Sequence, residues 1–196
     1  MWQGGLPMIV VLVGESASGK STVAKILEQE QPNFSKVVTY TTRPMRDGEV
    51  DGIDYNFISN KKFNELVEQD FFVEHASYRD WQYGTAINFN KDEDKVIILT
   101  PAGARALRVY AEKHTELQKY LMVVYLWVDR RSRMIKIIQR GDNIDEAYRR
   151  NLSDVGQFDA FEREADFTIK NENYKKNAME IYSELADLIK ARRENV

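Results

Sequence analysis

A glycine-rich octapeptide near the start of the chain has the residue types and spacing of a phosphate-binding loop. Residues 14–21 read Gly-Glu-Ser-Ala-Ser-Gly-Lys-Ser and follow an apolar run, residues 8–13. In such a loop the glycines let successive backbone N–H groups turn toward one anion, and the next helix directs the positive end of its dipole there. Lys20 adds a full charge for the β- and γ-phosphates of a nucleotide, and the Ser21 hydroxyl is a ligand for Mg²⁺. The pattern therefore predicts a nucleotide-binding site that carries out phosphoryl transfer.

The donor nucleotide is expected to be ATP, bound with Mg²⁺ as the cofactor. Ser21 is the expected metal ligand, and Lys20 is expected to act in catalysis as well as in binding. The expected ATP contacts are Gly14, Glu15, Ser16, Ala17, Ser18, Gly19, Lys20, Ser21 and Thr22.

Composition limits the class of protein. The 196 residues are 43% hydrophobic, which favours one compact domain with a sizeable core. The 28 basic and 31 acidic residues give a net charge of −3, so no basic excess favours nucleic acid or an anionic membrane as a partner. The absence of cysteine excludes disulfides, thiolate catalysis and cysteine-ligated metal. Residues 1–7 lack a basic signal-peptide region and residues 8–13 are too few to span a membrane, so a cytoplasmic protein is expected.

Short apolar runs alternate with segments of helical periodicity, which is typical of an α/β fold with a parallel sheet covered by helices. The periodicity is clearest near the end of the chain, where Ile181, Leu185 and Ile189 recur on one face. The expected core strands are residues 8–13, 36–40, 96–100, 122–128 and 167–170, and the expected helices are residues 20–29, 102–113 and 174–192.

Two regions interrupt this alternation. Residues 41–90 are rich in Arg, Tyr, Phe and Gly and contain strand-like pieces such as 54–58, which favours a small, mostly β insertion. Residues 129–161 are basic and then acidic. Most charged side chains in such a run only solvate a helix face, but one or two arginines reaching a phosphate would be enough for function. The six arginines are Arg130, Arg131, Arg133, Arg140, Arg149 and Arg150.

Three blocks make the chain similar to a known family. Residues 41–57 (TTRPMRDGEVDGIDYNF), 72–76 (FVEHA) and 83–85 (YGT) closely resemble the guanylate kinase signature, and they follow the loop in the family's order and spacing. The resemblance extends over nearly the whole chain and is weakest between residues 99 and 121. It implies a three-layer phosphate-loop kinase fold with a five-stranded parallel core sheet, in one domain spanning residues 1–196. The parts of this domain would be a core (about 1–36, 91–128 and 164–196), an acceptor-binding region (about 37–90) and a helical lid (about 129–163).

The same blocks contain side chains suited to a nucleoside monophosphate. Arg43 and Arg46 lie close together on a loop, and with the hydroxyls of Tyr55 and Tyr83 they form a set able to bind a dianionic phosphate. Taken alone, the two arginines would be interpreted as surface residues. The family resemblance implies that all four side chains hold the acceptor phosphate.

Glu74 is the candidate residue for recognising the base. A carboxylate accepts hydrogen bonds from the N1–H and the exocyclic amine of guanine, whereas adenine has an acceptor at N1 and would be repelled. The resemblance places two hydroxyl residues, Thr39 and Thr85, in the same pocket. The expected GMP contacts are Thr39, Arg43, Arg46, Tyr55, Glu74, Tyr83, Gly84, Thr85 and Thr100.

Residues 130–151 resemble the family's lid, which closes over the donor nucleotide and brings arginines to the transferring phosphoryl group. Arg140 stands in the family's Arg-Gly step. Alignment puts Asn151 where the family has a second arginine, and a shift of one position on a helix turns a side chain by about 100°. Arg150 is the expected substitute, with Arg149 as the alternative. The expected catalytic residues are Lys20, Arg140 and Arg150.

The chain departs from the family at the end of the expected strand 96–100. Ile98 and Thr100 stand where the family usually has two acids, which support Mg²⁺ and help to build the acceptor site. One interpretation is a weaker metal site, slower turnover or a changed base preference. The other is a harmless variation in which Thr100 supplies a hydroxyl and Mg²⁺ is held by Ser21 and ATP.

The leading hypothesis is ATP-dependent phosphorylation of GMP or dGMP by a monomer or weak homodimer. Its partners would be these small nucleotides, with neither nucleic acid nor membrane involved. A non-catalytic guanylate-kinase-like binding module is the second hypothesis; the intact loop argues against it, and the missing acids argue weakly for it. The third is a kinase of the same fold that acts on another nucleoside monophosphate.

Overall fold

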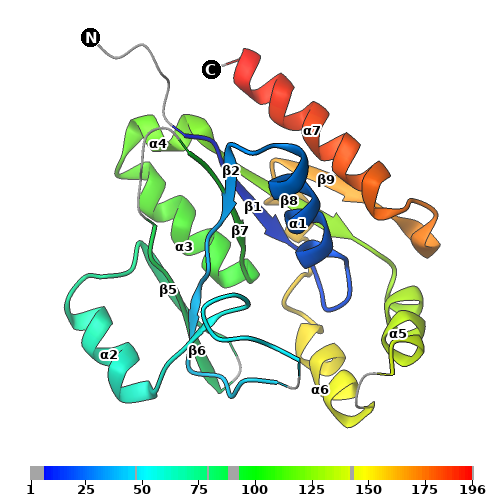
Figure 1. Ribbon diagram of the computed structural model, residues 1–196, viewed down its shortest axis with the longest axis horizontal. Coiled ribbons are helices and arrows are strands. Elements are labelled where there is room, and N and C mark those ends of the chain that lie inside the picture. Colours follow the sequence, from blue (N-terminus) through cyan, green and yellow to red (C-terminus); the bar gives the residue numbers. More distant parts are fainter. Residues whose placement is uncertain (1–6, 47, 79, 88–92, 142–143, 196) are drawn as a thin grey trace.

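The computed structural model describes residues 7–46, 48–78, 80–87, 93–141 and 144–195. Within these residues its centre is a five-stranded parallel sheet with the order β2-β7-β1-β8-β9 (Figure 1). This arrangement confirms the predicted α/β fold and its parallel core sheet. The strands are β1 Ile9–Val13, β2 Phe34–Lys36, β7 Asp94–Ile98, β8 Leu121–Trp127 and β9 Phe167–Lys170.

The central strand β1 is buried on both faces, and its five residues are all apolar. Val10 and Leu12 pack into the layer of α1 (Lys20–Glu30) and α7 (Ala178–Glu194). Ile9, Val11 and Val13 pack into the opposite layer, formed by α3 (Pro101–Glu112) and α4 (Thr115–Tyr120). Figure 1 shows the two pairs of helices on opposite sides of the sheet. A continuous apolar strand is typical of a parallel sheet that is covered on both faces.

A second, smaller sheet forms the insertion, with the strand order β4-β3-β6-β5. Its strands are β3 Tyr40–Thr41, β4 Asn56–Phe57, β5 Glu74–Tyr78 and β6 Trp81–Thr85. The insertion also contains a helix that the sequence analysis does not predict, α2 (Asn60–Glu68). Ser59 caps this helix by accepting the Lys62 N–H (3.2 Å), and Phe63 buries its apolar face.

Two helices form the lid region, α5 (Arg130–Gln139) and α6 (Ile144–Asp154). Asp129 caps α5 by accepting the Ser132 N–H (2.9 Å), and Gly141 follows the helix with φ 73°. Two short 3-10 turns, Phe161–Arg163 and Glu172–Tyr174, lie on either side of β9. Figure 1 shows the lid and the insertion on either side of the carboxyl end of β1.

The largest boundary differences from the sequence prediction are at the second core strand and the last helix. The sequence predicts the second core strand at 36–40, but the core sheet pairs only Phe34–Lys36 with β7, and the chain then enters the second sheet, where β3 pairs with β6. Local patterning does not show where a chain changes sheets. The sequence predicts the last helix from residue 174, but it begins at Ala178, because Asn173 and Tyr174 have positive φ and Asn177 and Glu180 form a capping box.

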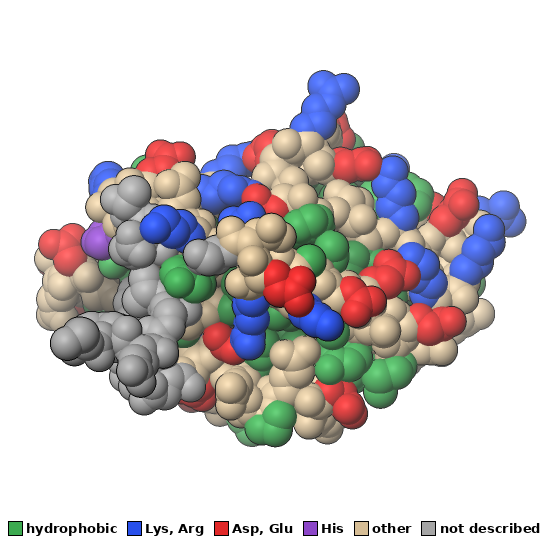
Figure 2. Space-filling model, turned by 90° about the horizontal axis from the view of Figure 1, so that it is seen from above, with side chains coloured by type: hydrophobic (Ala, Val, Ile, Leu, Met, Phe, Trp, Pro, Cys, Tyr) green, Lys and Arg blue, Asp and Glu red, His purple; other side chains and the backbone are tan. Residues whose placement is uncertain are grey.

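Charged side chains of both signs alternate across the face shown in Figure 2. This agrees with the near balance of 28 basic and 31 acidic residues. Among the helices of the described residues, none is both long enough and apolar enough to cross a membrane.

Replacing Leu185 by alanine is expected to lower the free energy of unfolding by about 2–5 kcal/mol, because its fully buried side chain would leave a cavity between α7 and the sheet. Urea unfolding followed by circular dichroism measures this loss. Met179→Ala is the matched control on the same helix, since Met179 is 49% exposed, and it should change stability by less than about 1 kcal/mol. Equal losses at the two positions would contradict the assigned buried face of α7.

Candidate active site

A cleft of about 770 Å³ lies where the core, the insertion and the lid meet. Its walls come from the loop after β1, the second sheet, the end of β7 and both lid helices. The carboxyl ends of parallel strands lie at one edge of a sheet, so β1 and β7 deliver the residues that follow them to the same place. The fold therefore assembles this site from segments far apart in the sequence.

The loop 14–21 joins β1 to α1 and has the geometry of an anion-binding turn. Ala17 (φ 66°) and Gly19 (φ 96°) lie in the left-handed region, which turns neighbouring N–H groups to one side. Gly14 leaves no room for a side chain, because an added Cβ would lie 2.5 Å from Ser18 Oγ and 2.6 Å from the Leu126 carbonyl oxygen. The close approach of the loop to β8 thus explains the first glycine of the motif.

Lys20 places a partly buried cation in the wall of the cleft. Its Nζ donates hydrogen bonds to the carbonyl oxygens of Gly14 (2.7 Å) and Glu15 (2.9 Å). Burial lowers the pKa of Lys20 to about 8, while the negative charges of Asp154 and Glu15 act in the opposite direction. The carbonyl groups orient the ammonium without neutralising it, so this end of the cleft favours an anionic ligand.

Glu74 places a buried carboxyl group in the same cleft. One oxygen accepts the hydroxyl of Thr85, and Oε2 has no hydrogen-bond partner within the described residues. Burial raises the pKa of Glu74 to about 7, and the Thr85 hydrogen bond opposes that rise. Thr39 and Gly103 line the same part of the cleft, and a Cβ at Gly103 would lie 3.2 Å from Oε2. An orphaned buried carboxylate oxygen is well suited to a ligand that carries N–H donors.

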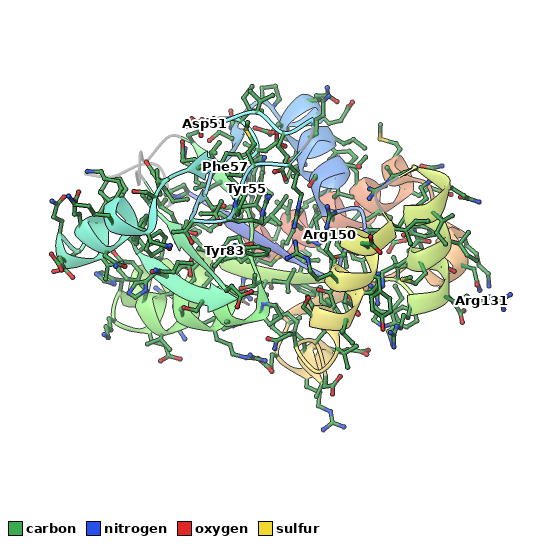
Figure 3. The ribbon with its side chains drawn as sticks, turned by 90° about the horizontal axis from the view of Figure 1, so that it is seen from below. Asp51, Tyr55, Phe57, Tyr83, Arg131 and Arg150 are labelled. Atoms are coloured by element: carbon green, nitrogen blue, oxygen red, sulfur yellow. The ribbon has the colours of Figure 1, made fainter. Side chains whose placement is uncertain are left out.

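Three of the four predicted phosphate ligands line the cleft, namely Arg46, Tyr55 and Tyr83. The rings of the two tyrosines lie 6.1 Å apart, and Figure 3 shows them close together in the insertion. Burial raises the pKa of Tyr55 to about 12, so its hydroxyl keeps its proton and can donate. These side chains offer one guanidinium and two hydroxyl groups to an anion.

The fourth predicted ligand, Arg43, is buried behind this set. Its guanidinium makes a two-pronged ion pair with Glu49 (2.8 and 2.9 Å) and lies over the rings of Tyr55 and Phe57. Glu49 also accepts the backbone N–H of Arg46 (2.8 Å). In this arrangement the Arg43–Glu49 pair holds the turn that carries Arg46.

The lid contributes Arg140 and Arg150 to the cleft wall. Figure 3 shows Arg150 of α6 on the side facing the loop and α1, whereas Arg131 of α5 points away from the molecule. Arg140 lies at the C-terminal end of α5, just before Gly141. Both arginines predicted to act in catalysis therefore lie at the site.

The two other lid residues considered in the sequence have different surroundings. Arg149 lies over the ring of Trp81 in β6, 5.0 Å from the centroid. Asn151 is buried, and its amide donates to the Ala147 carbonyl (3.4 Å) within α6. Of the two arginines left open by the sequence, Arg150 is therefore the one that lines the cleft.

At the end of β7, both Ile98 and Thr100 line the cleft. The Thr100 hydroxyl oxygen accepts the Gly103 N–H (3.1 Å) and caps α3, which leaves its proton available for donation. Gly84 packs against the ring of Phe72, where an added Cβ would lie 2.9 Å from a ring carbon. Gly84 thus contributes to the site by allowing β6 to approach the Phe72 ring.

Several cleft-lining residues escape the sequence analysis, and they share a polar or charged end. Glu49 has a detectable signal, because it follows two arginines in a short turn. Asp154 has none, since it bonds a loop residue 138 positions away. The cleft-lining residues that the sequence analysis does not identify include Lys36, Glu49, Asp54, Lys136, Asp154 and Tyr174.

Fold and site together define an α/β protein with a glycine-rich, anion-binding type of turn between β1 and α1. The family profile described as Guanylate kinase matches residues 7–192, so the chain belongs to the guanylate kinase family, as its sequence resemblance predicts. Among solved structures, guanylate kinase from Anaplasma phagocytophilum matches with a TM-score of 0.69 and 22% identity, over 96% of this chain and 87% of that chain. This likeness shows a shared fold. An uncharacterized protein from Eubacterium ventriosum matches with a TM-score of 0.49 and 13% identity, over 94% of this chain and 99% of that one.

Replacing Glu74 by glutamine is expected to stabilise the protein at pH 8 and to have much less effect at pH 4.5. The folded state raises the pKa of this carboxyl to about 7, so the cost of ionising it in the fold grows between its unfolded pKa and pH 7 and is constant above. The gain at pH 8 should be on the order of 2–3 kcal/mol. Urea unfolding at both pH values measures it.

The control for this experiment is Glu68→Gln, because Glu68 is exposed on α2 and its neutralisation should change stability little at either pH. A gain from Glu74→Gln of equal size at pH 4.5 and pH 8 would contradict a buried carboxyl that ionises near neutrality.

Proposed function

We propose that this chain catalyses the ATP-dependent phosphorylation of GMP or dGMP to the diphosphate. The observation that carries the proposal is the buried Glu74, whose Oε2 has no partner within the described residues and lies in one cleft with the phosphate loop. Guanine presents an N1–H and an exocyclic amine on one edge, and a carboxylate accepts both. Membership of the guanylate kinase family supports the same reaction class.

On the donor side, the loop 14–21 would hold the ATP phosphates with its backbone N–H groups and the Lys20 ammonium. Ser21 lies in the first turn of α1 and lines the cleft, so its hydroxyl would hold Mg²⁺ together with phosphate oxygens, which are ligands that this ion prefers. Gly14 permits the close approach of this loop to β8, because a Cβ there would collide with the Leu126 carbonyl oxygen. When bound, Mg²⁺ neutralises charge that develops on the phosphates.

On the acceptor side, the base would lie against Glu74 with Thr39 and Thr85 beside it. The monophosphate would then reach Arg46, Tyr55 and Tyr83, which donate charge-assisted hydrogen bonds. This pose directs the acceptor phosphate toward the loop.

In the transfer step, an oxygen of the acceptor phosphate attacks the γ-phosphorus in line. A new P–O bond forms while the bond from the γ-phosphorus to the β–γ bridging oxygen breaks, and ADP leaves with that electron pair. The acceptor phosphate is already anionic, so the step requires positioning and charge stabilisation more than a strong base. Lys20, Arg140 and Arg150 supply that stabilisation, and closure of the lid excludes the water that would hydrolyse ATP.

The proposal is tested by ADP production from ATP and Mg²⁺ with GMP, dGMP, AMP, CMP and UMP offered separately, beside a reaction without acceptor. Turnover with GMP or dGMP at least about a hundredfold above the other acceptors is expected, because the mismatched bases leave a buried carboxylate unpaired. Preferred turnover of another acceptor would contradict base reading by Glu74. Inactivity with all five would contradict the kinase assignment and favour a binding module.

Glu74→Gln should lower kcat/KM for GMP by about a hundredfold and change that for AMP much less. Glutamine offers one carbonyl acceptor where guanine needs two, and its amide would oppose the guanine donors. Initial rates with both acceptors measure the ratio. Thr42→Val, in the same region but bonded to the Gln82 backbone, is the control and should leave the GMP to AMP ratio unchanged. A constant ratio in Glu74→Gln would remove Glu74 as the base reader.

A further inference from the structure

Charged side chains of both lid helices hold the backbone of one loop residue, Ser16. Its N–H donates to Asp154 Oδ2 at the C-terminal end of α6 (2.8 Å), across 138 positions of sequence. Its carbonyl oxygen accepts a hydrogen bond from Nη1 of Arg133 in α5 (3.4 Å). Both backbone polar groups of this residue are therefore bound by the lid.

The preceding loop residue, Glu15, is held by its side chain. Oε2 accepts the hydroxyl of Tyr125 in β8 (3.1 Å), and Oε1 accepts from Nη2 of Arg133 (3.4 Å). Arg133 also donates from Nε to the Val128 carbonyl (3.0 Å), and its Nη1 lies 3.9 Å from Asp154 Oδ2. We call Glu15, Tyr125, Arg133 and Asp154 the loop–lid tie.

The members of the loop–lid tie are buried, with exposed fractions of 9% for Glu15, 3% for Tyr125, 4% for Arg133 and 8% for Asp154. Buried ion pairs are costly to desolvate, and apolar packing would serve stability at least as well. In this structure, the charged side chains of the tie bond to one another and to the backbone of the loop. The Lys20 ammonium donates to the Glu15 carbonyl, and the charges of Asp154, Glu15 and Arg133 all act on the pKa of Lys20.

We propose that Arg133 and Asp154 are positioning residues for the donor phosphates: they fix Glu15 and Ser16 of the phosphate loop. The inference rests on the proposed donor site for ATP. Donor binding should depend on the tie, because the tie holds the residues that orient Lys20. Acceptor binding should not, because Glu74, Arg46 and Tyr83 lie on the insertion, outside the tie.

The first test measures hydrogen exchange at the Ser16 amide by NMR in the full chain without nucleotide. Asp154→Leu removes the acceptor and should abolish protection of this amide, whereas Asp154→Asn keeps an oxygen acceptor and should retain most of it. Asp145→Asn, exposed on the same helix, is the control and should leave the amide as protected as in the unchanged protein. Equal protection in all four proteins would overturn the tie.

The second test measures dissociation constants by calorimetry for ADP with Mg²⁺ and, separately, for GMP. Asp154→Leu should weaken ADP binding about tenfold through the unpaired Ser16 N–H, and leave GMP binding within about twofold. Asp154→Asn should recover most of the ADP affinity, which a loss of stability alone would not produce. Equal weakening of both ligands, or unchanged ADP affinity, would overturn the positioning role.

A second pair of variants covers the case in which Asp154→Leu does not fold. Glu15→Gln combined with Arg133→Met removes a buried anion and a buried cation together, and it should weaken ADP binding with GMP binding unchanged. Arg131→Met is the control, because Arg131 points away from the molecule (Figure 3). ADP affinity equal to that of the control would overturn the proposal.

The outcomes separate this proposal from the proposed function. If ADP binding depends on the tie but the protein phosphorylates none of the acceptors, the positioning role is supported and the proposed kinase activity is contradicted. If Asp154→Leu keeps full turnover of GMP and an unchanged affinity for ADP, the proposed kinase activity is supported and the positioning role is contradicted. Failure of the unchanged protein to bind ADP would reject both.

Discussion

The structure depends on one partly buried cation. The Lys20 ammonium donates to two carbonyl oxygens, at 2.7 and 2.9 Å, and neither of them carries a full negative charge. Desolvation of an ammonium is costly, and it lowers the pKa of Lys20 to about 8 although the negative charges of Asp154 and Glu15 oppose this fall. Three local features position this cation in the cleft. They are the lack of a side chain at Gly14, the left-handed turn at Gly19 and the start of α1. A cation held in this way supports the polyphosphate ligand that we propose.

The same cleft also contains a buried acid, and the cation and the acid together explain the selectivity that we propose. Glu74 is desolvated, and its Oε2 has no partner within the described residues, so it favours a ligand with adjacent N–H donors. Arg46 from the insertion and Arg150 from the lid line this cleft as well. The parallel sheet brings these residues together, because β1 and β7 end at the same edge of the sheet. The insertion and the lid are themselves connections between core strands.

Local sequence was sufficient for those parts of the molecule whose cause is local. The loop 14–21 is contiguous, the central strand is a short apolar run, and the helix predicted at residues 102–113 is α3, Pro101–Glu112. It was insufficient where the cause is distant. The strand after α1 ends at Lys36 because the chain changes sheets, and Asp154 meets Ser16 across 138 positions. Arg149 and Arg150 differ only in the direction in which α6 presents them, and Arg43 is buried by an ion pair with Glu49 that its own motif does not reveal.

The most direct test is the pKa of the Lys20 side chain, read by NMR of the labelled ammonium in the free protein and with saturating ADP and Mg²⁺. The expected result is titration near pH 8 in the free protein and a rise above about 10 with nucleotide bound, because the phosphates add negative charge beside the ammonium. Lys20→Met identifies the resonance by its loss. A Lys20 that titrates at its ordinary value when free, or that does not respond to bound ADP, would contradict a cleft organised around this partly buried cation for phosphate.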